Sequence, residues 1–127
     1  MNILEKRATA LYLNFREEID RLFIPDFLKY MVDVIPIGEG AEIGIMCIAR
    51  CDTWLYIDCL YICPEYRRQG LGKRAVLDWY KKQNEEIRLH IINNNTVALK
   101  FWQSIFELQE IEIGEIDTLF RIKRAKN

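Results

Sequence analysis

The chain lacks the features that mark several large classes of protein. Its formal net charge is only −1, from 18 Lys and Arg against 19 Asp and Glu, so no overall field directs it to nucleic acid or to an anionic lipid surface. Its apolar runs fall far short of the roughly 20 residues that a membrane-spanning helix needs. The first residues turn polar at once, unlike a secretory signal. We therefore expect a cytoplasmic protein with neither a nucleic-acid nor a membrane partner.

Metal-binding cysteine patterns are also missing. The four cysteines form two pairs, Cys47 with Cys51 and Cys59 with Cys63, and each pair is spaced i, i+4. This spacing does not match the common zinc motifs, so we expect no metal site. Without a secretion signal, we interpret the cysteines as reduced and mostly buried thiols. A reactive thiol on the strand face that Cys59 and Cys63 share is the alternative.

The length favours one globular domain. A chain of 127 residues with 50% hydrophobic residues can bury one core without disulfides or a metal. We see no internal repeat and no linker. The sequence therefore predicts a single domain over residues 1–127.

Hydrophobic spacing predicts the order of the elements. We expect helices at 4–23 and 26–34, a loop at 36–40, strands at 41–50 and 54–63, a helix at 73–84, a strand at 87–92, a helix at 97–104 with Asn95 or Thr96 as its N-cap, and strands at 105–113 and 117–122. A right-handed strand–helix–strand crossover would make strands 54–63 and 87–92 parallel. The basic segment 121–126 is interpreted as a solvated, frayed end.

A short basic turn joins strand 54–63 to the next helix. Pro64 ends the strand because it has no N–H to donate, and Gly70 and Gly72 open the helix. Arg67 and Arg68 add positive charge. The first N–H groups of a helix have no intrahelical partner and lie at the positive end of its dipole. The pattern thus predicts an anion site, most often for phosphate, although a glycine turn that only joins two elements is the alternative.

Two common nucleotide motifs do not fit this turn. The Walker motif requires Ser or Thr after Lys73, where this chain has Arg74. The dinucleotide fingerprint requires a third glycine, where this chain has Val76. The turn is therefore a phosphate-binding candidate of a third kind.

The spacing Arg67-x-x-Gly70-x-Gly72, shortly after Pro64, resembles the acyl-coenzyme A signature of the GNAT N-acetyltransferase superfamily. The resemblance implies an α/β (α+β) fold, a single GNAT-like domain whose mixed central sheet has a splayed parallel strand pair and flanking helices. Many relatives begin with a strand before the first helix; this sequence leaves no room for one, so we expect that strand to be absent here. The residues that the resemblance places on the coenzyme A pyrophosphate are Arg67, Arg68, Gln69, Gly70, Leu71, Gly72 and Lys73. The pantetheine arm would pair with the exposed backbone at Leu60 and Ile62, like an added strand.

A second motif supports the resemblance. Asn95-x-x-Ala98-x-x-x-Trp102 matches the family's later signature, and these three residues would flank the lower part of the coenzyme. Many relatives have at the Trp102 position a tyrosine that protonates the leaving thiolate. An indole N–H can donate a hydrogen bond but is no useful acid near neutral pH. Either another group or water supplies the proton, or Trp102 only packs on the coenzyme.

The remaining catalytic groups follow from the chemistry of acyl transfer to an amine. The amine must lose a proton, and Asp58 is the first candidate base because it lies on strand 54–63 among apolar neighbours. An ion-paired carboxylate is the alternative interpretation of Asp58. His90, the only histidine, is out of phase with its apolar neighbours, and we interpret it as packed rather than as a base. The backbone N–H of Ile62 is the candidate donor to the developing oxyanion.

The sequence leaves more than one function open. The first hypothesis is an N-acetyltransferase that moves the acetyl group of acetyl-CoA to an amine, carried by a small molecule or a protein. The second is a non-catalytic acyl-CoA-binding or sensor module, because Trp102 replaces the acid and no base is evident. A nucleic-acid-binding domain is a weaker third hypothesis that the net charge disfavours. A homodimer is one of the oligomeric states that the sequence leaves open.

Overall fold

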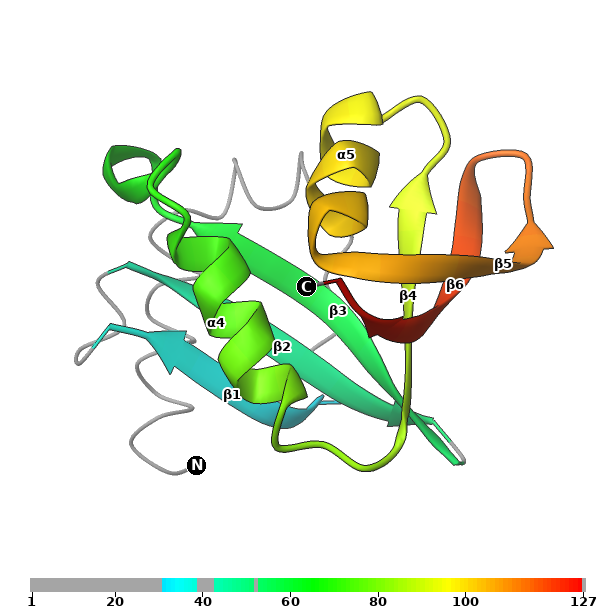
Figure 1. The fold of residues 1–127 in the computed structure, drawn as a ribbon, viewed down its shortest axis with the longest axis horizontal. Coiled ribbons are helices and arrows are strands. Elements are labelled where there is room, and N and C mark those ends of the chain that lie inside the picture. The colour runs from blue at the N-terminus through cyan, green and yellow to red at the C-terminus, as the bar shows by residue number, and fades with distance from the viewer. Residues whose placement is uncertain (1–30, 39–42, 52, 127) are drawn as a thin grey trace.

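The computed structural model describes residues 31–38, 43–51 and 53–126. The elements are strands β1 (Met31–Ile37), β2 (Gly44–Cys51) and β3 (Trp54–Ile62), a short 3₁₀ turn η1 (Pro64–Tyr66), helix α4 (Leu71–Tyr80), strand β4 (Glu86–Ile92), helix α5 (Thr96–Ile105), and strands β5 (Phe106–Ile113) and β6 (Asp117–Ala125) (Figure 1). The predicted helix at 4–23, most of that at 26–34 and the predicted absence of a first strand lie outside the described residues.

The described strands form one sheet in the order β1-β2-β3-β4-β6-β5. Strands β3 and β4 are parallel, as the crossover rule predicted, and every other neighbouring pair is antiparallel. Helices α4 and α5 lie on one face of this sheet, α4 over β1 to β3 and α5 beside β4 and β5 (Figure 1). The predicted mixed α+β architecture is therefore confirmed.

Strand β1 corrects two predictions. Residues 31–34 were assigned to a helix and residues 36 and 37 to a loop, but all belong to a strand that pairs antiparallel with β2. Pro36 explains the outcome, since it cannot continue a helix and forces the residue before it toward extended backbone. The β-branched residues of MVDVIPI also favour a strand.

An irregularity in β3 resets which side chains face the helices. The register shifts between Cys47 and Ile48, so that Cys47 opposes Cys59, Ile48 opposes Ile57, and Asp58 is left without a Cα partner in β2. Such a bulge breaks the two-residue alternation of a strand. Its consequence is that the strand is buried on both faces and that alternation does not assign a face to Asp58.

The main core fills the space between the sheet and the two helices. It contains the buried residues Met46, Ile48, Leu55, Ile57, Val76, Trp79, Ile87, Leu89, Ile91, Trp102, Ile105, Phe106, Phe120 and Ile122. The buried Cys47 alternates with the core residues Met46 and Ile48 and so faces the other side of the sheet. Beyond the bulge, Cys59 and Tyr61 oppose Cys47 and Ile45 and lie on that same side. The four cysteines are free thiols, three of them buried, as the sequence predicted.

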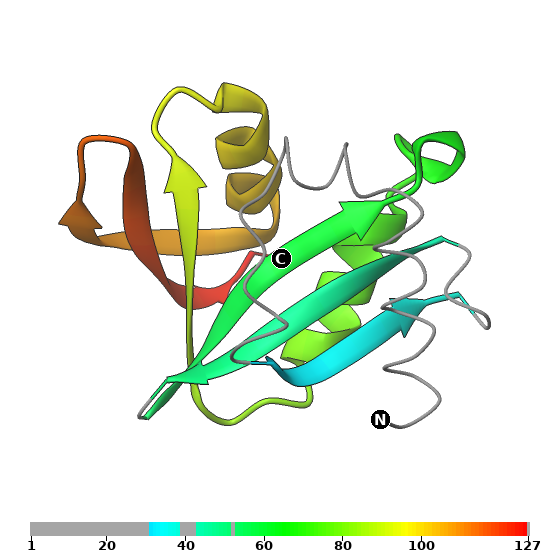
Figure 2. The same cartoon turned by 180° about the vertical axis from the view of Figure 1, so that it is seen from behind.

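Strands β3 and β4 diverge after a short common start. They pair only at Trp54 with Glu86, Leu55 with Ile87, and Tyr56 with Arg88, so residues 57–62 have no partner in β4. The two strands separate toward the ends that carry η1 and α5, and both ribbon views show this opening (Figures 1 and 2). We call this opening the fork.

The paired start of the fork is held together by side chains. The Arg88 guanidinium lies 3.9 Å above the centre of the Trp54 ring. Its Nε also donates to Glu86 at 2.5 Å. We call this paired start, Trp54–Tyr56 with Glu86–Arg88, the vertex of the fork. A cation over an indole face and a charged hydrogen bond both stabilise the vertex.

The basic end of the chain is not frayed as predicted. Strand β6 continues to Ala125, which pairs with Phe106 of β5. Arg124 donates to Glu107 at 2.5 Å, and Lys126 N–H donates to the carbonyl of Ile105 at 2.8 Å. These bonds correct the sequence interpretation, because pairing with β5 orders residues that composition alone assigned to solvent.

Over the part of the chain that the structure describes, no helix has both the length and the apolar character that crossing a bilayer requires.

Candidate active site

The turn between β3 and α4 has a tightly defined backbone. Tyr66 N–H donates to the Cys63 carbonyl at 2.9 Å, and Arg67 N–H donates to the Pro64 carbonyl at 3.3 Å. Arg68 and Gly70 then both take positive φ angles, 63° and 74°. Positive φ suits glycine and is costly for other residues, so Arg68 is held in an unusual conformation at the entrance to α4.

Unused backbone donors gather at the end of this turn. The first hydrogen bond of α4 runs from Arg74 N–H to the Gly70 carbonyl at 3.1 Å. Within the described residues, no amide of residues 68–73 donates to a backbone carbonyl. These groups lie at the positive end of the dipole of α4, and such an arrangement favours an anion.

Gly72 lies where three elements approach each other. A Cβ on Gly72 would stand 3.3 Å from Cγ1 of Ile62 and 3.6 Å from Cζ of Phe101. The first distance is shorter than an ordinary van der Waals contact, so any larger residue would push on the end of β3 and on α5. Glycine here lets the start of α4 lie close against the end of β3 and against α5.

Arg67 connects the turn to the strand that it follows. Its Nε donates to the Ile62 carbonyl at 2.7 Å, and its guanidinium lies 5.3 Å from the centre of the Tyr61 ring. Gln69 folds back in a similar way, with Nε2 donating to the Glu65 carbonyl at 3.3 Å. Arg68 and Lys73 are exposed, so their charges add to the positive field of the turn.

The edge of β3 in the fork presents backbone groups to the opening. Cys63 N–H donates to the Ile43 carbonyl at 2.7 Å, on the β2 side. Successive residues of a strand point their N–H groups in opposite directions. The N–H groups of Ile62 and Leu60 therefore point toward the fork, where β4 offers them no partner.

Helix α5 borders the other side of the fork. Asn95 caps it, as predicted, because its side-chain oxygen accepts from Ala98 N–H at 3.0 Å. Trp102 is only 8% exposed and packs in the core, edge-on to Phe101 at 5.1 Å and stacked on Phe106 at 6.4 Å. The indole is thus part of the core layer beneath the fork.

Asp58 is half-buried at the bulge of β3. The pKa of the nearby Cys47 thiol is raised well above its usual range, first by its hydrogen bond with Cys59, then by burial and by the charges of Cys59 and Asp58. The Asp58 carboxylate is therefore near enough to Cys47 to contribute to this raised pKa. Its role as a base stays a prediction.

The structure brings together two residues that the sequence did not connect. The Tyr56 hydroxyl lies 2.6 Å from Nδ1 of His90, and the two rings meet edge to face with centroids 5.5 Å apart. His90 is exposed, which corrects its interpretation as a packed side chain. Only the register of the two parallel strands joins them, and no spacing within one segment signals that register.

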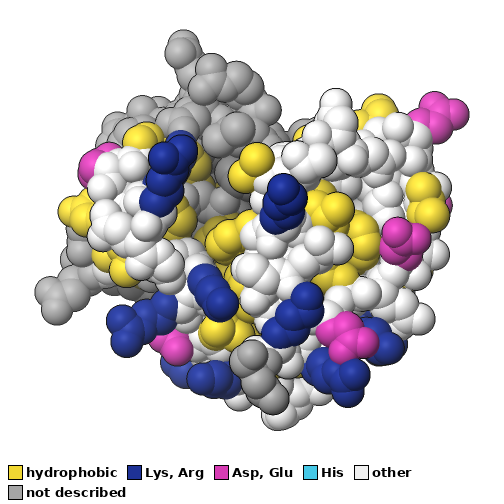
Figure 3. Space-filling view, turned by 45° about the horizontal axis from the view of Figure 1, so that its top comes forward, with side chains coloured by type: hydrophobic (Ala, Val, Ile, Leu, Met, Phe, Trp, Pro, Cys, Tyr) yellow, Lys and Arg dark blue, Asp and Glu magenta, His cyan; other side chains and the backbone are white. Residues whose placement is uncertain are grey.

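The molecular surface is hollowed between the two halves that flank the fork. Figure 3 shows hydrophobic side chains between these halves and Lys or Arg side chains on both of them. The exposed Lys and Arg residues of the turn and of helices α4 and α5 are Arg67, Arg68, Lys73, Arg74 and Lys100. An apolar floor between cationic rims suits a ligand with a neutral arm and anionic ends.

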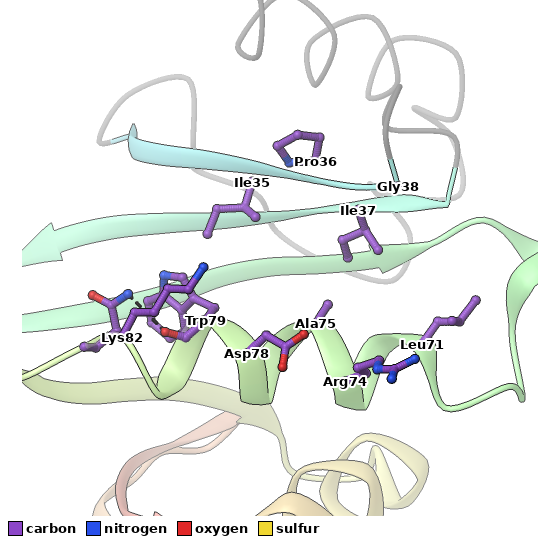
Figure 4. A pocket seen from close by; sticks show the side chains of 11 residues that line it. Ile35, Pro36, Ile37, Gly38, Leu71, Arg74, Ala75, Asp78, Trp79 and Lys82 are labelled. Carbon is purple, nitrogen blue, oxygen red and sulfur yellow. Dashed lines mark hydrogen bonds between the residues drawn. The ribbon is translucent and has the colours of Figure 1, made fainter.

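A separate groove of about 490 Å³ lies between β1 and α4, away from the fork. Ile35, Ile37 and Ala75 point into it, and Arg74 and Asp78 of α4 and Lys82, just past the helix, stand along its rim (Figure 4). Of the turn residues 68–73 only Leu71 lines it, and no residue of β3 does. We therefore do not assign the active site to this groove.

In the described segments, no group of three or more His, Cys, Asp or Glu side chains could hold a metal ion.

Comparison with known proteins agrees with this geometry. The sequence model of the Acetyltransferase (GNAT) family matches residues 5–106. The chain is 30% identical over 91 residues to the protein named "Putative acetyltransferase YjbC" of Bacillus subtilis strain 168. That match covers 72% of this chain and 45% of YjbC.

Solved structures share the fold. The PaiA N-acetyltransferase of Thermoplasma acidophilum, crystallised with coenzyme A, superposes with a TM-score of 0.53 at 24% identity, over 65% of this chain and 54% of its own. A GNAT-family protein of Bacteroides thetaiotaomicron superposes with a TM-score of 0.61 at 15% identity, over 92% of this chain and 85% of its own. A GNAT acetyltransferase of Elizabethkingia anophelis with acetyl-CoA bound superposes with a TM-score of 0.53 at 17% identity, over 84% of this chain and 82% of its own. The chain spans about half the length of YjbC and of the Thermoplasma protein.

Proposed function

Because the chain belongs to the GNAT acetyltransferase family, we propose that it transfers the acetyl group of acetyl-CoA to the amine of an acceptor. The carrying observation is the set of unused amides at residues 68–73 next to the open edge of β3. The first feature fits a diphosphate, and the second fits an extended amide-containing arm. Their order along the chain matches a coenzyme that enters at the turn and points into the fork.

The turn would hold the pyrophosphate of the coenzyme. Backbone N–H groups and the charges of Arg68 and Lys73 would bind its oxygens. Arg67, held on the Ile62 carbonyl, would fix the turn relative to the strand. Residues Gln69, Gly70, Leu71 and Gly72 would contribute mainly through their main chain.

The edge of β3 would guide the arm toward the vertex of the fork. Residues 57–62 span roughly 17 Å at about 3.3 Å per residue. The N–H groups of Leu60 and Ile62 would pair with the arm. The sequence favoured the Ile62 N–H as the oxyanion donor, but Leu60 lies nearer the vertex of the fork, so its N–H is the better placed donor as the carbonyl is attacked. Acetyl-CoA supplies the activated thioester, and this chain's residues bind and orient it.

The leaving thiolate would take its proton from water. Trp102 is buried in the aromatic layer and carries no acidic group. Asn95 and Ala98 are engaged with each other at the start of α5, so they would shape the side of the fork. Thiolate is a good leaving group, so transfer does not depend on a side-chain acid.

A non-catalytic acyl-CoA sensor is the second candidate. The observation that favours it is the buried Trp102 in place of an acid. Such a module would bind acetyl-CoA through the same turn and edge and release no thiol.

One experiment separates these functions. Acetyl-CoA binding is measured by calorimetry, and thiol release is then followed against a panel of small amines and peptides. The enzyme proposal expects binding and amine-dependent thiol release; binding without release against a broad panel supports the sensor. Gly72→Val should abolish binding in both cases, whereas Lys81→Ala, past the far end of α4, should not. Coenzyme binding that survives Gly72→Val contradicts both proposals.

A further inference from the structure

Tyr56 and His90 form a 2.6 Å contact between a hydroxyl and an imidazole near the vertex of the fork. We propose that these two residues act together as the proton acceptor of the acyl transfer, with the Tyr56 hydroxyl facing the acceptor amine and the His90 imidazole behind it. This inference rests on the proposed function and assigns its general base.

Position along the strands supports the assignment. Tyr56 is the last residue of β3 that pairs with β4, opposite Arg88. His90 lies two residues further along β4, roughly 7 Å on, where the strands have begun to part. A coenzyme arm that runs along the β3 edge from the turn would bring its thioester toward this point. The pair thus stands where the acyl group and the amine must meet.

The pair faces away from the coenzyme-side helices. Leu89 and Ile91 of β4 and Leu55 and Ile57 of β3 all lie in the core beneath α4 and α5. Tyr56 and His90 alternate with them and so lie on the opposite face. An acceptor could therefore approach from that face while the coenzyme lies in the fork.

The charged groups near His90 do not contact its imidazole within the described structure. The charged groups that share this face on the adjoining strands are Glu86 and Arg88 of β4 and Asp117, Arg121 and Lys123 of β6, with Asp58 at the bulge of β3. Arg88 is engaged by Glu86 and Trp54, and Arg121 donates to Gln109 at 3.0 Å. In the described structure none of these groups forms a hydrogen bond or ion pair with the imidazole. Tyr56 is therefore its partner on this face.

The proposed step balances as follows. The lone pair of the amine nitrogen forms the new C–N bond, and the C–S bond electrons leave with the coenzyme sulphur. The nitrogen gives its proton to the Tyr56 oxygen while the phenol proton passes to Nδ1 of His90. The exposed imidazolium then loses a proton to solvent, and the thiolate takes one from water. Imidazole suits this role because histidine changes charge near neutral pH.

His90 is the only histidine, so its NMR signals are unambiguous. Nitrogen-detected spectra at pH 8 should show Nδ1 as the hydrogen-bonded acceptor and Nε2 as protonated. Tyr56→Phe should move the Nδ1 resonance of this imidazole, because it removes the hydroxyl 2.6 Å away, whereas Tyr80→Phe, which removes a half-buried hydroxyl from α4, should not. Unchanged imidazole signals in Tyr56→Phe contradict the pair without reference to any acceptor.

Kinetics test the role of the pair with any amine that the wild type acetylates. Tyr56→Phe and His90→Ala should each lower kcat/KM about a hundredfold, with little further loss in the double variant, because the two residues act as one unit. The fall of kcat/KM toward low pH, the acid limb of the pH profile, should disappear in His90→Ala. His90→Asn keeps an acceptor for the phenol but no useful base, and should stay as slow as His90→Ala.

The outcomes separate this inference from the proposed function. Acetyl-CoA affinity should remain unchanged in all four variants, since none of them touches the turn. If the wild type releases thiol and His90→Ala keeps its rate and pH profile, the relay is wrong and the enzyme stands. If the wild type releases no thiol with any acceptor, the enzyme proposal fails and the relay fails with it.

Discussion

Nε of Arg67 donates to the carbonyl oxygen of Ile62 at 2.7 Å. The bond runs from the anion-binding candidate turn to the last residue of β3, so the turn and the open edge of the fork form one unit. Removing the guanidinium would release both from each other.

Arg67→Ala should therefore weaken coenzyme binding about tenfold, which corresponds to about 1.4 kcal/mol. Arg67→Lys should restore little of this, because an ammonium keeps the charge but not the planar Nε geometry. Calorimetric titration with coenzyme A measures both variants. Full affinity in Arg67→Lys would show that charge alone matters.

Gly70 and Gly72 should respond differently to alanine. A Cβ on Gly70 meets nothing within 4 Å, but its φ of 74° makes any side chain strained. Gly70→Ala should thus cost about 1–2 kcal/mol of unfolding free energy. Gly72→Ala should cost less stability yet weaken coenzyme binding more, because its Cβ lies 3.3 Å from Ile62. Denaturant unfolding and calorimetry distinguish the two effects, and the reverse ranking would count against this account of the turn.

Asp58 should prove secondary to catalysis. If the Tyr56–His90 pair takes the proton, Asp58→Asn should lower turnover by less than about tenfold and leave the acid limb of the pH profile in place. The measurement is kcat/KM between pH 5.5 and 9 on the best acceptor. Loss of that limb in Asp58→Asn would return the role of base to this carboxylate.

Trp102 should matter for stability. Trp102→Ala removes a buried ring from the stack with Phe106 and should lower the unfolding free energy by about 3–5 kcal/mol. Trp102→Tyr should not increase turnover, since this position is part of the buried aromatic layer. A marked increase in kcat for Trp102→Tyr would instead show that a missing acid limits the rate.

The raised pKa of the Cys47 thiol predicts how stability depends on pH. Its causes are, first, the hydrogen bond with Cys59, and then burial and neighbouring charges. The folded protein keeps this proton when the unfolded chain loses it, so the contribution is complete below about pH 8.5 and falls above it. Each such group changes the unfolding free energy by at most about 1.4 kcal/mol per pH unit. Cys47→Ala should flatten the slope between pH 8.5 and 10, and Cys51→Ala should not.

Local signals in the sequence predicted much of the fold. Pro64, Gly70 and Gly72 marked the turn before α4, and Asn95 marked the start of α5 as its N-cap. These predictions succeed because proline, glycine and capping side chains act on the backbone next to them.

Pairing between distant strands explains the misses. Residues 31–34 fit a helical stripe, but pairing with β2 made them a strand. The basic end became ordered through β5, and His90 met Tyr56 only through the parallel register of β3 and β4. The bulge at Asp58 likewise comes from the register with β2. Such registers depend on the whole sheet and leave no local pattern.

The central claim is that the main-chain amides of residues 68–73 bind the coenzyme's diphosphate. The direct test is an amide NMR titration of the chain with coenzyme A and, separately, with pantetheine, which has no phosphate. Coenzyme A should shift the amides of residues 68–73 together with those of Leu60 and Ile62, and pantetheine should shift only the latter two. Saturation with coenzyme A that leaves the turn amides unmoved would contradict the account.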